Sequence, residues 1–141
     1  MRAQWMLGFL SLATLIGGAG CGDCKNSEDM GVCPVRCDSL WLPETIGAGD
    51  TLDILIVGSV AGAYHLRLDR VEIHREADRL ELRVWAQASR WLGECGTVMP
   101  PSCPWLDLEI AEPPPWAGDS IQVIVQQPEA PPVERWVRVL H

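Results

Sequence analysis

Residues 71–85 read VEIHREADRLELRVW, and this stretch carries the strongest structural signal in the chain. Apolar and charged side chains alternate on both sides of Ala77-Asp78, as they do in a β-hairpin with one face on a core. A turn at these two residues makes five opposed pairs complementary: apolar with apolar, acid with base, or cation with indole. The predicted pairs are Val71 with Val84, Ile73 with Leu82, Glu72 with Arg83, His74 with Glu81, and Arg70 with Trp85.

The same strand continues toward its N-terminal end with a change of phase. Leu66 and Leu68 fall on the face opposite to that of Val71 if the alternation is unbroken. We therefore predict a β-bulge near Asp69 and Arg70, because one extra residue in a strand restores the apolar side chains to the core face.

Strand signals also dominate the rest of the chain from Ser39 onward. Short runs rich in Val, Ile, Leu and Trp are separated by Gly, Pro or Asp, and no segment shows a helical apolar stripe. Spacing of this kind predicts an all-β, antiparallel β-sandwich of about seven strands. The expected strands cover residues 40–42, 51–57, 65–75, 80–88, 105–111, 120–126 and 133–140.

The first twenty residues have the features of an export signal. Arg2 supplies a positive charge, residues 6–16 are apolar, and the small residues 17–20 precede Cys21. This arrangement resembles a bacterial lipoprotein signal, which implies that Cys21 is lipidated and becomes the first residue of the mature protein. Gly18 stands where that pattern usually has leucine, so ordinary cleavage near Gly20, without a lipid, is the alternative.

Three segments follow from these signals. Residues 1–20 form the predicted lipoprotein signal peptide, residues 21–39 a polar, cysteine-containing tether without periodicity, and residues 40–141 the β-sandwich domain. The chain is acidic, with 19 Asp and Glu against 11 Lys and Arg and a net charge of -8. This balance argues against a nucleic-acid partner, because binding phosphates needs a clustered basic surface.

The six cysteines allow two interpretations. Cys21, Cys24, Cys33 and Cys37 have spacings that resemble a zinc site, but an oxidising envelope favours disulfides and a lipidated Cys21 has no thiolate to offer. We predict no metal, and Cys24, Cys33 and Cys37 are candidates for further disulfides.

The remaining two cysteines lie in one long loop, residues 89–104. Cys95 and Cys103 are predicted to pair with each other, because local closure costs the least chain entropy. If Cys21 carries a lipid, five cysteines remain and one is unpaired; if it does not, all six can pair.

Catalytic patterns are absent from the sequence. The chain has three histidines and no nucleophile-elbow, phosphate-loop or zinc-protease motif. His74 is expected to be a surface partner of Glu81. Asp107 and Glu109 alternate with apolar residues, which is typical of a half-solvated strand rather than of a glycosidase pair. We predict that the protein is not an enzyme and uses no cofactor.

Tryptophan is unusually frequent, with seven in the whole chain. Exposed tryptophans on a sheet can form a platform for sugars or proteins. Trp85 falls in phase with charged neighbours, and Trp91 and Trp105 flank the long loop. Such tryptophans can also be half-buried beneath loops, which is the alternative we favour; if the protein has a binding surface, Trp85, Trp91 and Trp105 mark it.

Several features together resemble uncharacterised bacterial envelope lipoproteins with an immunoglobulin-like β-sandwich. The resemblance rests on residues 43–46 (PETI), Gly49-Asp50, the hairpin at 71–86, the cysteine-bearing loop and residues 117–119 (AGD). It implies an immunoglobulin-like topology and carries no known site residues. Small envelope protease inhibitors share such sandwiches.

The predicted function is a lipid-anchored, non-enzymatic structural or binding module of the bacterial cell envelope. Its expected partners are the membrane, reached through the lipid anchor, and an envelope protein or glycan. The alternatives are a secreted or periplasmic protein, a β-sandwich protease inhibitor, and an envelope enzyme with an unrecognised site.

Overall fold

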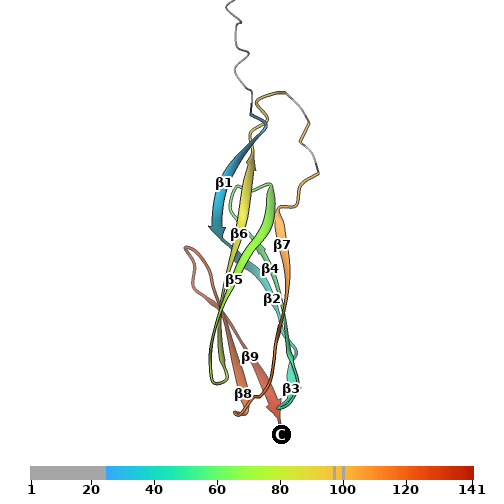
Figure 1. Ribbon diagram of the computed structural model, residues 1–141, viewed down its shortest axis with the longest axis vertical. Helices are drawn as coiled ribbons and strands as arrows, with labels where there is room; N and C mark the ends of the chain where they lie inside the picture. The colour runs from blue at the N-terminus through green and yellow to red at the C-terminus, as the bar shows by residue number, and fades with distance from the viewer. Residues whose placement is uncertain (1–24, 97, 100) are drawn as a thin grey trace, which may run out of the picture.

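The computed structural model describes residues 25–96, 98, 99 and 101–141. These residues form nine β-strands in two sheets that share one apolar core (Figure 1). The all-β, two-sheet architecture predicted from the sequence is confirmed. The strands are β1 (Ser27–Pro34), β2 (Arg36–Trp41), β3 (Thr45–Gly47), β4 (Leu52–Ser59), β5 (His65–Glu76), β6 (Arg79–Trp91), β7 (Trp105–Glu112), β8 (Ser120–Gln126) and β9 (Val133–Leu140).

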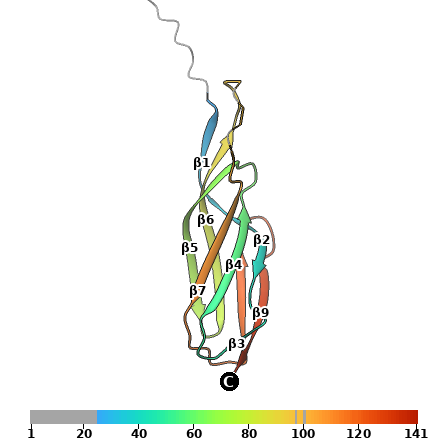
Figure 2. The same cartoon turned by 90° about the vertical axis from the view of Figure 1, so that its right-hand side faces the viewer.

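The large sheet has six strands and the small sheet has three. In the large sheet β6 pairs with β5 along one edge. Along its other edge β6 pairs with β1 near one end and with β8 near the other. The sheet then continues from β8 to β9 and from β9 to β3. The small sheet has the order β2-β4-β7. The molecule is elongated, with β1 at one end and the C-terminus at the other (Figures 1 and 2).

Two neighbouring strand pairs are parallel, which corrects the expectation of an antiparallel sandwich of about seven strands. β6 runs parallel to β8, and β3 runs parallel to β9. The pairing of β6 with β8 arises because β7, which connects them in sequence, belongs to the small sheet, so the chain returns to the large sheet in its original direction. Six and three strands also differ from the four and three of an immunoglobulin constant domain.

The hairpin register predicted from residues 71–85 is confirmed. All five predicted pairs, from Arg70 with Trp85 to His74 with Glu81, are opposed across β5 and β6, and the turn falls at Ala77-Asp78. The expected bulge is also present, between Leu68 and Arg70.

The ion pairs expected within this hairpin differ from those observed. Glu72 accepts a hydrogen bond from Arg70 of its own strand at 3.2 Å, and Glu81 pairs with Arg79 at 3.7 Å. The long arginine side chains lie along their strands, so the carboxylates find cations beside them instead of across the ribbon. The predicted contact of Arg70 with the Trp85 ring is present, at 4.8 Å from the ring centroid.

The centre of the core comes from β4 and β6. Leu52, Ile54 and Ile56 of β4 alternate with outward residues and are at most 1% exposed, and Leu80 and Leu82 of β6 are fully buried. Burying a side chain of this size contributes about 1.5–3 kcal/mol. The core therefore lies where the central strands of the two sheets face each other.

The predicted tether is wrong from residue 27 onward. β1 pairs antiparallel with the second half of β6, from Ser27 with Trp91 to Pro34 with Trp85, and β2 lies in the small sheet. The sequence did not reveal these strands because β1 shifts register at residues 29–31 and β2 at residues 37–39, which interrupts the alternation of both. The sandwich therefore starts well before residue 40.

Residues 113–119 cover the end of the sandwich near the C-terminus. Trp116 is 2% exposed, and its Nε1 donates a hydrogen bond to the carbonyl of Asp50 at 2.9 Å. The Arg75 guanidinium lies 3.9 Å from the centroid of the Trp116 ring and donates to the carbonyl of Pro113 at 2.6 Å. One buried indole thus joins the loop to β5 and to the turn between β3 and β4.

Candidate functional site

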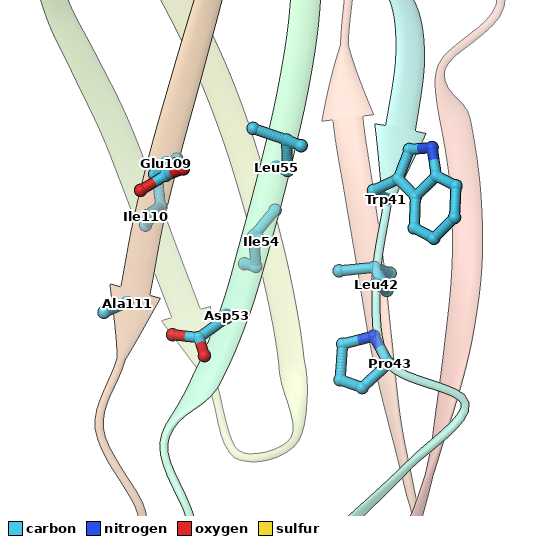
Figure 3. A pocket seen from close by; sticks show the side chains of 9 residues that line it. All are labelled: Trp41, Leu42, Pro43, Asp53, Ile54, Leu55, Glu109, Ile110 and Ala111. Carbon is cyan, nitrogen blue, oxygen red and sulfur yellow. The ribbon is translucent and has the colours of Figure 1, made fainter.

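An open groove lies on the outer face of the small sheet. Its cavity volume is about 670 Å³. Figure 3 shows the end of β2 with the two residues after it on one side, β4 in the middle and β7 on the other side. The lining residues are Trp41, Leu42, Pro43, Asp53, Ile54, Leu55, Glu109, Ile110 and Ala111.

Strand alternation places the functional side chains of the groove. Leu52, Ile54 and Ile56 point into the core, so Asp53 and Leu55, which alternate with them, point outward. The register sets Leu55 opposite both Trp41 of β2 and Glu109 of β7. An indole, an aliphatic side chain and a carboxylate therefore form one row across the three strands.

The wall formed by β2 ends in an exposed aromatic side chain. Trp41 is 69% exposed and is the last residue of β2 paired with β4. Leu42 and Pro43 continue the wall beyond that last pair. Proline has no N–H to donate to a sheet, which suits a segment that leaves its neighbour strand.

The groove is electronegative. Asp53 and Glu109 are exposed, and Figure 3 shows the Asp53 carboxylate directed from β4 toward β7. No ion pair among the described residues includes Asp53, Asp107 or Glu109. Arg36 is the only Lys or Arg in the three strands of this sheet, and it lies 3.6 Å from Asp38.

The predicted surface of Trp85, Trp91 and Trp105 is not one surface. Trp85 and Trp91 lie on the outer face of the large sheet, where Trp91 packs edge-on against Tyr64 at 5.7 Å between ring centroids. Trp105 is 54% exposed and lies on the outer face of the small sheet. Trp105 shares that face with Trp41 but lies outside the groove. It pairs with Ser59, which is four residues along β4 from Leu55.

Trp85 nonetheless has a small site of its own. Its ring lies under the Arg70 guanidinium, beside a shallow hollow that it forms with Pro34, Arg83 and Gln126. The Trp85 Nε1 atom is buried and has no hydrogen-bond partner among the described residues. Arg70 already covers one face of the ring, so this indole is less accessible than that of Trp41.

The predicted disulfide between Cys95 and Cys103 is wrong. Cys103 is an exposed free thiol, and Cys33 and Cys37 are also free. The backbone holds the two loop cysteines in different places, since Cys95 N–H donates to Asn26 Oδ1 at 3.3 Å while the carbonyl of Cys103 accepts from Leu66 N–H at 2.9 Å. Cys21 and Cys24 lie outside the described residues.

The environments of the free thiols differ. Cys37 is 7% exposed, and burial, followed by the nearby Asp38 carboxylate, raises the pKa of its thiol. The thiolate is the reactive form, so both burial and the raised pKa protect Cys37. Cys103 is exposed and is the accessible thiol of the long loop.

A thiol reagent at neutral pH is expected to modify Cys103 in the folded protein and Cys37 only after unfolding, as followed by mass spectrometry of peptides. The folded state disfavours the Cys37 thiolate. The contribution of Cys37 to the stability of the fold is therefore fully present below the pKa of the thiol in the unfolded chain. It is lost as the pH rises through the higher pKa of the thiol in the folded protein. Cys103→Ser should remove the fast modification. Rapid modification of Cys37 in the native protein would contradict the burial.

Sequence reasoning missed Trp41 as a site residue. The available signal was its position between Leu40 and Leu42, which predicts the opposite face if residues 36–41 are a strand. The groove also needs β4 and β7 as neighbours of β2, and no local pattern predicts that. Asp107 and Glu109 were expected on a solvated face, and both are exposed.

No protein-family model, no curated protein and no solved structure matches this chain. Within residues 25–141, apart from positions 97 and 100, no helix has the length and apolar content that a membrane crossing needs. The same residues hold no cluster of three or more His, Cys, Asp or Glu arranged to bind a metal ion.

Proposed function

We propose that the protein is a lipid-anchored, non-enzymatic binding module of the bacterial cell envelope. The observation that carries the binding role is the groove on the small sheet. A large indole, 69% exposed, borders an apolar floor on the outer face of an otherwise well-packed sandwich. Exposed apolar surface of this kind, with polar residues around it, is typical of interaction sites.

The chemistry of the groove supports binding more than catalysis. Its side chains include no histidine, cysteine, serine or lysine. The two carboxylates, Asp53 and Glu109, are exposed to water, whereas a catalytic carboxylic acid is usually kept protonated by an apolar environment. An open face with solvated carboxylates holds a ligand without activating it.

The anchor is supported by the signal-like residues 1–20 and by Cys21, which follows Ala19 and Gly20. A chain spans at most about 3.3–3.6 Å per residue, so a lipid on Cys21 would lie within about 14 Å of Lys25. The end of the sandwich that carries β1 would then face the membrane. β2 runs away from that end (Figure 2), so the groove would be open to the envelope space.

An immunoglobulin-like relationship is part of the same proposal. Two packed sheets with repeated crossings between them support it. The parallel pairing of β6 with β8 counts against a standard immunoglobulin strand order.

Metabolic labelling with a fatty acid tests the anchor. The wild-type protein is expected to carry the label and to partition with detergent, whereas Cys21→Ser should do neither, because the thioether to the lipid cannot form. Cys103→Ser is the matched control and should be labelled like the wild type. Equal labelling of Cys21→Ser, or no label in any protein, would contradict the anchor.

A further inference from the structure

We infer that the groove binds a basic, extended polypeptide segment, with one Lys or Arg side chain over the Trp41 indole and a second beside Glu109 and Asp53. This inference rests on the proposed binding function and adds the class of partner. It follows from the charges around the groove, the chemistry of the exposed indole and the dimensions of the three-strand row.

The charges select a cationic partner. Asp53 and Glu109 line the groove, and Asp107 lies two residues before Glu109 on the same face of β7. None of these three carboxylates has an ion-pair partner among the described residues. Arg36, the one cation in these strands, is already close to Asp38. Like charges on neighbouring strands repel, so a bound cation would relieve that repulsion and gain attraction.

The indole favours the same partner. Elsewhere in this chain Arg70 lies over Trp85 at 4.8 Å and Arg75 over Trp116 at 3.9 Å, so two indole rings already hold a guanidinium. Trp41 has no such contact among the described residues and is 69% exposed. A cation over an exposed indole strengthens binding by about two- to fivefold, and by more when water is excluded.

The dimensions of the row favour an extended segment. Trp41, Leu55 and Glu109 lie on three adjacent strands, which are about 4.8 Å apart, so the row spans about 10 Å. An extended peptide rises about 3.3 Å per residue. Side chains on one face of an extended segment recur at every second residue, so two basic residues four apart lie about 13 Å apart on the same face and reach both ends of the row with their flexible side chains, while an apolar residue midway between them would lie over Leu55.

The test is a binding titration by fluorescence anisotropy, with the protein extracted from the envelope in mild detergent. The probe is a fluorescein-labelled heptapeptide with lysines at positions two and six and valine at position four, which share one face of an extended chain; a peptide with both lysines replaced by glutamine is its control. We expect the lysine peptide alone to bind, and its affinity to fall as ionic strength rises.

Variants locate the site. Asp53→Asn combined with Glu109→Gln, and separately Trp41→Ala, should each weaken binding by about tenfold, the size of a few weak exposed interactions. The matched controls are Asp119→Asn combined with Glu129→Gln, and Trp136→Ala, which remove the same groups from exposed positions outside the groove. They should change the affinity less than about twofold.

Three results would overturn the inference: equal binding of the two peptides, equal effects of groove and control variants, or no binding of the lysine peptide. Binding of an uncharged tetramer of N-acetylglucosamine in place of the peptide, lost in Trp41→Ala, would assign the groove to a glycan and leave the binding function intact. The anchor is tested separately by fatty-acid labelling of Cys21, so failure of one proposal is distinguishable from failure of the other.

Discussion

Replacing Trp116 by alanine is expected to lower the free energy of unfolding by about 3–5 kcal/mol, the cost of removing a large aromatic side chain from a core. The ring is 2% exposed and its Nε1 donates to the carbonyl of Asp50. The change also removes the surface on which the Arg75 guanidinium rests. Urea unfolding followed by circular dichroism measures the effect.

Trp136→Ala is the matched control for this experiment. Trp136 is 61% exposed on β9, so its loss should change the free energy of unfolding by no more than about 0.5 kcal/mol. If Trp116→Ala does not fold, Trp116→Phe provides a milder change that keeps the ring but loses the hydrogen bond. Equal effects at positions 116 and 136 would show that the loop 113–119 is not anchored as described.

Leu82→Ala is expected to cost about 2–5 kcal/mol, because Leu82 is fully buried on the central strand β6. Its opposed residue in the hairpin, Ile73, is 41% exposed since β5 lies at the edge of the large sheet. Ile73→Ala should therefore cost about 1 kcal/mol. The same unfolding measurement compares the two variants.

This comparison tests the burial of Ile73 and Leu82 independently of the β5–β6 register that sets them opposite each other. The sequence alone predicts that Ile73 and Leu82 share one face, and it gives no reason to expect different costs. The structure predicts a difference of at least twofold, because only one of the two strands has neighbours on both sides. Equal costs would contradict the edge position of β5.

Local signals were sufficient for the hairpin. The register of β5 with β6 and the bulge between Leu68 and Arg70 follow from complementary pairs that are near in sequence. β1 was missed because a shift near Gly31, which has φ of 76°, interrupts its alternation. The parallel pairing of β6 with β8 was missed because it depends on a distant strand, β7, joining the other sheet.

The candidate site was predictable only in part. Sequence reasoning identified exposed tryptophans as candidate binding residues and expected Glu109 on a solvated face, and both features occur on the small sheet. It could not select Trp41, because the groove joins residues 41–43, 53–55 and 109–111 through pairing between strands far apart in sequence. The disulfide prediction failed for a related reason, since closeness in sequence did not place Cys95 beside Cys103.

The claim that the outer face of the small sheet is the binding surface is tested by a heteronuclear NMR titration. The labelled protein is titrated with the lysine heptapeptide while its backbone amides and tryptophan indole N–H groups are followed. We predict that the perturbed signals cluster at Trp41, Asp53, Leu55 and Glu109. Perturbations confined to the large sheet, around Trp85, Trp91 or Trp136, would contradict the claim, as would a titration that moves no signal.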